Sequence, residues 1–127
     1  MDYFYKKEVT LSFEKALEKT KTELSKEGFG VLTEIDVKAT LKKKLDTEYD
    51  NYSILGACNP PLAYRALTAE KNIGLLLPCN VIVYEDGGKV YVSAIVPSVA
   101  MNMVENYSLT EIAREVDEKL ARVIGAV

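Results

Sequence analysis

Alternating apolar and polar positions predict two strands in the first third of the chain. Residues 3–10 alternate between apolar and polar or charged side chains, and residues 31–37 do the same. In the second segment we expect Val31, Ile35 and Val37 on one face of the strand.

Two further strand regions follow from apolar runs bounded by turn residues. Residues 52–58 hold no charged side chain, which favours a strand in the interior of a sheet. Residues 78–85 and 89–96 flank the sequence Asp86-Gly87-Gly88, which is typical of a tight hairpin turn. We therefore predict a third strand and then a β-hairpin.

Apolar residues at helical spacing predict four helices between these strands. One begins after Ser12, a short one follows the second strand with Leu41 and Leu45 one turn apart, and the others begin at Pro60 and at Ser108. Ser108 and Glu111 have the spacing of a capping box, and we expect them to open the last helix.

The predicted order is strand, helix, strand, short helix, strand, helix, hairpin, helix, in a single domain over residues 1–127. Residues 98–105 fit either a short helix or an irregular lid. A hairpin set between helices favours an α+β fold over a doubly wound one. We expect two layers: a mixed, mostly antiparallel sheet with the helices packed on one face. The other face carries tyrosines and polar residues, and is either half-solvated or meets a second subunit.

Composition excludes several function classes. The chain has 127 residues, two cysteines, no histidine and a formal net charge of -3. The acidic balance argues against a nucleic-acid partner, and the apolar runs are too short to span a membrane. Without histidine, a Ser-His-Asp or Cys-His mechanism cannot be built within one chain. We predict no metal and no cofactor, a cytoplasmic location, and cysteines that remain reduced thiols.

Cys58 is the leading candidate for chemistry. It lies between an apolar strand and a helix start in which Asn59 is a suitable N-cap and Pro60 a suitable first helical residue. A helix N-terminus lowers the pKa of a nearby thiol through its dipole and its free N–H groups. Cys79 has a similar setting in Pro78-Cys79-Asn80. If Cys79 lies far from Cys58, we expect it to be an ordinary core residue. If the two lie close together, they would form a dithiol pair.

Four further side chains complete the candidate ligand or thiol site. Asn59 and Asn80 each follow a cysteine, and Tyr64 and Arg65 lie one turn into the helix that starts at Pro60. An amide or a guanidinium there could bind a ligand. Capping by Asn59 and an ion pair of Arg65 with a surface acid are the structural alternatives.

A second candidate is the acidic pair Glu34 and Asp36. They lie two residues apart on a predicted strand and therefore on one face. Two carboxylates so placed can share a proton or a cation. The alternatives are a solvated sheet face, or Asp36 as the cap of the next helix.

Three separated motifs resemble domain of unknown function family 302. They are residues 28–41, Leu-Gly-Ala-Cys-Asn-Pro at 55–60 and Leu-Leu-Pro-Cys-Asn-Val at 76–81. The hairpin residues Val-Tyr-Glu-Asp-Gly-Gly and the later Ile-Val-Pro at 95–97 fit the same family. The resemblance implies a compact α+β domain found as a homodimer. It implies no reaction and no catalytic residue.

We therefore expect a small homodimeric domain that binds a small ligand or a thiol-reactive species near Cys58 without turnover. One alternative is a thiol-dependent redox or transfer enzyme that uses Cys58 as nucleophile and Cys79 as resolving thiol. A second alternative is a purely structural interaction module.

Overall fold

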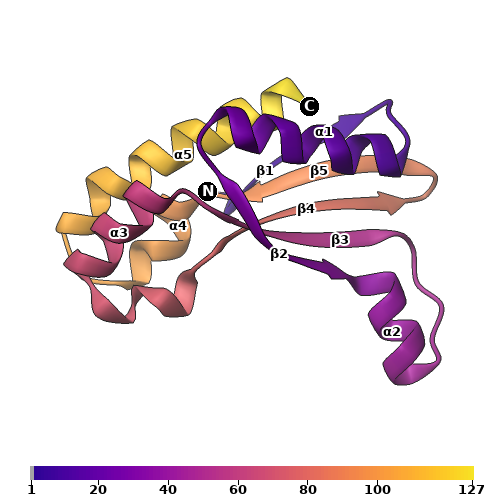
Figure 1. The fold of residues 1–127 in the computed structure, drawn as a ribbon, viewed down its shortest axis with the longest axis horizontal. Coiled ribbons are helices and arrows are strands. Elements are labelled where there is room, and N and C mark those ends of the chain that lie inside the picture. Colours follow the sequence, from indigo (N-terminus) through magenta and orange to yellow (C-terminus); the bar gives the residue numbers. More distant parts are fainter. Residues whose placement is uncertain (1) are drawn as a thin grey trace.

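The computed structural model describes residues 2–127 as a sheet with helices around it (Figure 1). The strands are β1 (Phe4–Val9), β2 (Gly30–Asp36), β3 (Tyr52–Cys58), β4 (Cys79–Asp86) and β5 (Lys89–Ile95). The α-helices are α1 (Phe13–Lys26), α2 (Val37–Leu45), α3 (Pro60–Ala69), α4 (Pro97–Ala100) and α5 (Ser108–Ala126). Two 3₁₀ turns, η1 (Lys71–Leu76) and η2 (Met101–Met103), complete the order.

The five strands form one sheet in the order β1-β5-β4-β3-β2. All four pairings are antiparallel, so the α+β fold expected from the strand and helix order is confirmed. β3 lies between β2 and β4, as its lack of charge predicts. Helices α1 and α5 lie on one side of the sheet, and α2 projects from the end of β2 on the other side (Figure 1).

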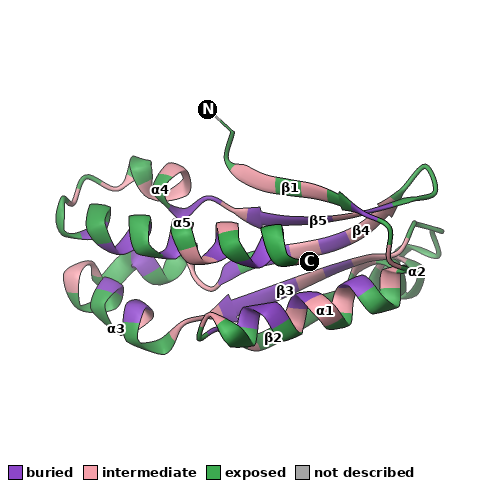
Figure 2. Ribbon diagram, turned by 90° about the horizontal axis from the view of Figure 1, so that it is seen from above, coloured by how far each residue is buried: buried purple, intermediate pink, exposed green. Residues whose placement is uncertain are grey.

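The core lies between the sheet and the two long helices. Figure 2 shows the buried residues along the strands and along the sides of α1 and α5 that face them. Fully buried side chains at the centre are Leu24, Leu55, Val81, Val83, Val92, Leu120 and Val123. Since burying one such side chain stabilises the fold by about 1.5–3 kcal/mol, this layer holds the helices in place.

A bulge changes the face assignment of β2. Val31 pairs with Ala57, but the register shifts before Thr33, and Ile35 pairs with Ile54. Ala57 is buried under the helices, whereas Ile54 lies on the opposite face of β3. Val31 and Ile35 therefore lie on different faces, and the prediction that they share one is wrong, because the bulge inserts a residue. Val37, placed on that same face, instead begins α2.

The hairpin between β4 and β5 has the predicted turn. Asp86 pairs with Lys89 across Gly87 and Gly88, whose φ angles are +58° and +80°. Positive φ at both central positions gives the turn a twist that matches its strands, and glycine adopts it at little cost.

The start of α5 differs from the sequence prediction. Ser108 is the first helical residue, and no side chain caps the helix at Tyr107. The Asn106 side-chain oxygen instead accepts a hydrogen bond from the Ser108 N–H at 3.0 Å. The capping box of Ser108 and Glu111 is therefore wrong, because Asn106, two residues earlier, takes the capping role. The ambiguous segment 98–105 is mostly helical, as α4 and η2.

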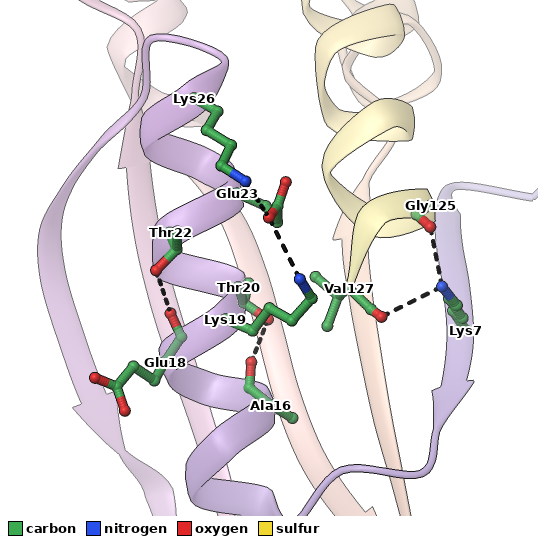
Figure 3. Close-up of polar contacts among 10 residues, drawn as sticks. All are labelled: Lys7, Ala16, Glu18, Lys19, Thr20, Thr22, Glu23, Lys26, Gly125 and Val127. Atoms are coloured by element: carbon green, nitrogen blue, oxygen red, sulfur yellow. Dashed lines mark hydrogen bonds and ion pairs between the residues drawn. The ribbon is translucent and has the colours of Figure 1, made fainter.

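Polar contacts secure α1 and the end of α5 (Figure 3). The buried Thr20 hydroxyl donates to the Ala16 carbonyl at 2.7 Å, so its polar atom is satisfied inside the helix. Glu23 accepts from Lys26 at 2.9 Å, and this hydrogen bond lowers the pKa of the Glu23 carboxyl. Lys7 on β1 donates to the carbonyl of Gly125 at 2.9 Å, where the last turn of α5 leaves its carbonyls without helical partners.

The face of the sheet away from α1 and α5 carries an aromatic ladder. Tyr52, Tyr84 and Tyr91 stand side by side on three neighbouring strands, with successive ring centroids 5.3 Å apart. Lys6 on β1 lies 4.4 Å above the Tyr91 ring. The expected tyrosine-bearing second face is therefore present.

Candidate functional site

An apolar cavity of about 280 Å³ lies at the end of the sheet, between α3 and α5. Its wall combines the ends of β3 and β4 with α3, η1, η2 and α5. The lining residues include Phe29, Leu32, Ala57, Cys58, Asn59, Leu62, Ala63, Ala66, Leu67, Gly74, Leu77, Pro78, Cys79, Met101, Ile112, Ala113 and Val116. Asn59 is the one carboxamide among these side chains, and no charged residue lines the cavity.

Small residues keep this space open. α3 and α5 both extend past the sheet at the same end of the molecule (Figure 1). They turn Ala63 and Ala66 from one helix and Ala113 from the other toward the cavity, and Gly74 adds a position without a side chain. Methyl groups fill less volume than the leucines and valines of the main core, so the two helices enclose a hollow here rather than a packed layer.

Cys58 is half-buried in the cavity wall, as the last residue of β3. Asn59 caps α3 as predicted: its side-chain oxygen accepts the Leu62 N–H at 3.4 Å. Pro60 and Pro61 have no N–H, and the Ala63 N–H donates to the Asn59 carbonyl at 2.9 Å. Residues 60–63 at the start of α3 therefore offer Cys58 no free N–H group.

Cys79 lies deeper than Cys58. It is 8% exposed, and burial raises its pKa to about 11. Burial is the largest cause of this value, the nearby Cys58 and Asp117 contribute to it, and the Cys79 thiol therefore stays protonated at neutral pH. A neutral buried thiol is a poor nucleophile.

The register of β3 and β4 separates the two sulfur positions. Cys79 pairs with Ala57, the residue before Cys58. Neighbouring residues on a strand point to opposite faces, so the side chains of Cys58 and Cys79 leave their strands in different directions. This divergence of the two side chains disfavours a direct Cys58–Cys79 disulfide, although both residues line the cavity.

Three other predicted site residues lie outside the cavity lining. Tyr64 is 73% exposed on the outer side of α3. Arg65 is also exposed and pairs with Glu115 on α5 at 3.3 Å. Asn80 pairs with Gly56 and is exposed on the open side of the sheet, beside Ile82. The cavity thus brings together Cys58, Asn59 and Cys79 and leaves these three apart.

Glu34 and Asp36, the predicted acidic pair, each make a separate structural contact. Glu34 on β2 forms an ion pair with Lys21 on α1 at 2.6 Å. Asp36 caps α2 by accepting the Ala39 N–H at 2.9 Å, which is the helix-cap alternative considered for it. Both side chains are exposed and each is engaged by a separate partner.

Asn59 also connects two parts of the chain. Its side-chain nitrogen donates to the Glu27 carbonyl at 3.2 Å, just before Gly28. A Cβ atom on Gly28 would lie 3.1 Å from that nitrogen, and the φ of Gly28 is +84°. The α1–β2 turn is thereby tied to the start of α3, which fixes one rim of the cavity.

Sequence reasoning missed most of the cavity wall. Leu62, Ala63, Ala66 and Leu67 follow the inward face of α3, but that pattern equally fits a packed core. The alanines of α3 were the one feature of the sequence that could have indicated a cavity. Nothing in the sequence shows that they lie opposite Ala113 on α5. Only the fold brings the two helices together.

Two negative findings apply to residues 2–127. Within that range no group of three or more His, Cys, Asp or Glu side chains could hold a metal ion. No helix in the same range combines the length and the apolar character needed to cross a membrane.

Comparisons with known proteins identify the family. A crystal structure of an uncharacterised conserved DUF302 protein from Bacillus stearothermophilus superposes with a TM-score of 0.94, at 28% identity, over 99% of this chain and 98% of that chain. Among curated proteins, none matches the chain significantly. Residues 5–127 match the family described as "Domain of unknown function DUF302", and the chain belongs to that family.

Proposed function

We propose that this domain binds a small, uncharged, apolar ligand in the cavity between α3 and α5, without turnover. The observation that carries the proposal is the cavity itself, whose wall is almost wholly hydrocarbon. Ligand sites are typically concave and apolar with a few polar groups, and here Cys58 and Asn59 supply those groups.

The size of the cavity indicates the size of the ligand. An engineered cavity of about 150 Å³ lined by leucine, isoleucine and phenylalanine stays dry and binds benzene. The space of about 280 Å³ in this protein is nearly twice as large. A ligand of about two fused rings, or a short branched chain, would fill it.

Binding is favoured over the thiol-enzyme alternative by the state of Cys79. A resolving thiol has to form a thiolate and reach its partner sulfur, whereas burial raises the Cys79 pKa to about 11. The strand register also directs the two side chains apart. Cys58 then serves as part of the wall, in contact with the ligand. Both cysteines are free thiols, which supports a cytoplasmic location for this binding.

Solution NMR with naphthalene as the probe tests the proposal. Naphthalene is expected to shift the methyl resonances of Ala66, Ala113 and Met101, which line the cavity. Replacing Ala63 with phenylalanine places a ring in the cavity and is expected to weaken naphthalene binding at least tenfold. Ala63 is half-buried, so the added ring has room on the cavity side.

Ala126→Phe is the matched control, since Ala126 is exposed at the end of α5 and outside the cavity. This variant should bind naphthalene like the unmodified protein. The proposal fails if no cavity methyl shifts up to the solubility limit of naphthalene, or if Ala63→Phe binds it as well as Ala126→Phe does.

A further inference from the structure

We propose that a second, polar hollow binds a free α-amino acid by its two charged groups. The hollow has a volume of about 200 Å³ and lies between α5 and the segment formed by α4 and η2. Met101 and Ala113 line both spaces, so the hollow lies beside the apolar cavity. The polar side chains that line only the hollow are those of Ser98, Asn102, Asn106, Thr110, Arg114 and Asp117. The proposal therefore does not rest on a ligand in the apolar cavity.

The packing of α4 against α5 forms this hollow. α4 lies beside the first half of α5, at the end of the molecule where α3 also lies (Figure 1). The Asp117 carboxylate accepts the Ser98 N–H at 3.0 Å, which ties the start of α4 to α5. Asn106 donates to the Ala69 carbonyl at 2.8 Å and holds the link that leads from η2 to α5. Both walls of the hollow are therefore fixed by hydrogen bonds.

Arg114 and Asp117 give the hollow one positive and one negative group. They lie three residues apart on α5, so their Cβ atoms are neighbours on one side of the helix, about 5–6 Å apart. None of the ion pairs found among residues 2–127 includes either residue. A carboxylate can accept several hydrogen bonds, so the bond from Ser98 leaves Asp117 with acceptor capacity. Two opposite charges that line one space without pairing with each other suit a ligand that carries both charges.

A free α-amino acid matches this arrangement of charges. Its carboxylate would accept two parallel N–H bonds from the Arg114 guanidinium, and its ammonium group would donate to Asp117. Such charge-assisted hydrogen bonds are roughly twice as strong as neutral ones. Thr110 lies one turn before Arg114 on α5 and adds a hydroxyl group to the same wall. A ligand with a single charge would leave either Arg114 or Asp117 without its partner.

The apolar part of the wall indicates the side chain of the amino acid. Leu109 and Ala113 are buried, and Met101 and Val104 are half-buried beside them. Since a cavity of about 150 Å³ binds benzene, a hollow of about 200 Å³ has room for a small aliphatic amino acid. The branched side chain of valine would contact these four residues while its charged groups meet Arg114 and Asp117.

An NMR titration of the full chain with L-valine tests the proposal. Valine is expected to shift the resonances of Thr110 and Arg114, which line only the polar hollow, and to leave the Ala66 methyl resonance of the apolar cavity unchanged. Isovalerate lacks the ammonium group of valine and isobutylamine lacks its carboxylate. Each is expected to bind at least tenfold more weakly than valine. The naphthalene titration reports through Ala66, so failure of one proposal is distinguishable from failure of the other.

Two variants separate the roles of the two charges. Arg114→Gln is expected to weaken valine binding at least tenfold without weakening isobutylamine, since the guanidinium contacts the carboxylate of the ligand. Asp117→Asn is expected to weaken valine by a similar factor without weakening isovalerate. The asparagine oxygen can still accept the Ser98 N–H, so the contact between α4 and α5 is kept.

Glu118→Gln is the matched control, because Glu118 is exposed on α5 and lies outside the hollow. This variant should bind valine like the unmodified protein. Three results would each overturn the proposal. Valine shifts neither Thr110 nor Arg114, isovalerate or isobutylamine binds as tightly as valine, or either of the two charge variants binds valine as well as Glu118→Gln does.

Discussion

The two cysteines have different environments although they line one cavity. Cys58 is half-buried at a strand end, whereas Cys79 is buried and its pKa is raised to about 11. Desolvation causes most of that increase, because the charged thiolate loses its hydration inside the protein. The difference predicts which thiol a reagent reaches and how the protein responds to alkaline pH.

Cys79 should make the protein less stable at alkaline pH. Its thiol has a reference pKa of 9.0 and titrates at about 11 in the folded protein. Below pH 9 both states hold the proton and Cys79 adds no pH dependence. As pH rises from 9 to 11 only the unfolded chain releases it, so the free energy of unfolding should fall, by at most about 3 kcal/mol.

Urea unfolding of Cys79→Ala and of the unmodified protein, at several values between pH 8 and pH 11, measures this contribution. The fall in stability over that range should be smaller in the variant. Tyr5 and Tyr52, whose pKa values burial also raises, titrate in both proteins and cancel in the difference. Parallel pH profiles for the two proteins would contradict the assignment.

At the scale of elements, close contacts between strand ends shape the cavity rim. Gly56 on β3 lies against Thr33 on β2 and against Pro78, which precedes β4. A Cβ atom at position 56 would lie 2.8 Å from the Pro78 ring and closer still to the Thr33 hydroxyl. The ends of β2, β3 and β4 can therefore pack this closely only because residue 56 has no side chain.

Gly56→Ala is expected to destabilise the protein by about 1–3 kcal/mol, as overpacking of a tight site does. The Thr33 side chain can rotate, but the Pro78 ring is rigid and has to shift with its backbone. Gly30→Ala provides the control, because a Cβ at Gly30 meets no atom within 4 Å. Equal urea midpoints for the two variants would show that the contact at Gly56 relaxes freely.

At the scale of the whole molecule, the N-terminal strand holds the C-terminal helix. Lys7 donates to the Gly125 carbonyl at 2.9 Å and to the main-chain oxygen of Val127 at 3.3 Å (Figure 3). A cation at a helix C-terminus is favourable because the dipole places partial negative charge there. Glu27 and Arg122 add a second link, from α1 to α5, at 2.9 Å.

Lys7→Gln removes this charge and should lower the free energy of unfolding by about 0.3–1 kcal/mol at low salt. The loss should shrink as sodium chloride is added, since salt screens interactions at the surface. Lys71→Gln, at an exposed lysine in η1, should change the stability little at either ionic strength. A loss that does not depend on salt would point to packing of the Lys7 stem instead.

Local sequence signals predicted the elements well. Asn59 and Pro60 mark the start of α3, and Gly87-Gly88 marks the hairpin, because capping and positive φ depend on neighbouring residues alone. The errors came where a distant segment takes part. The bulge in β2 arises from its pairing with β3, and the Asn106 side chain that caps α5 also donates to the Ala69 carbonyl at 2.8 Å.

The sequence by itself determined which segments become strands and helices, the antiparallel α+β class and the character of the tyrosine-bearing face. These follow from periodicity, turn chemistry and charge, which act over a few residues. Only the tertiary structure decided that α3 and α5 enclose a cavity and that Cys58 and Cys79 share its wall. It also placed Asn80, Tyr64 and Arg65 outside that wall. Such placements depend on packing and register between segments far apart in the chain, and no local pattern records them.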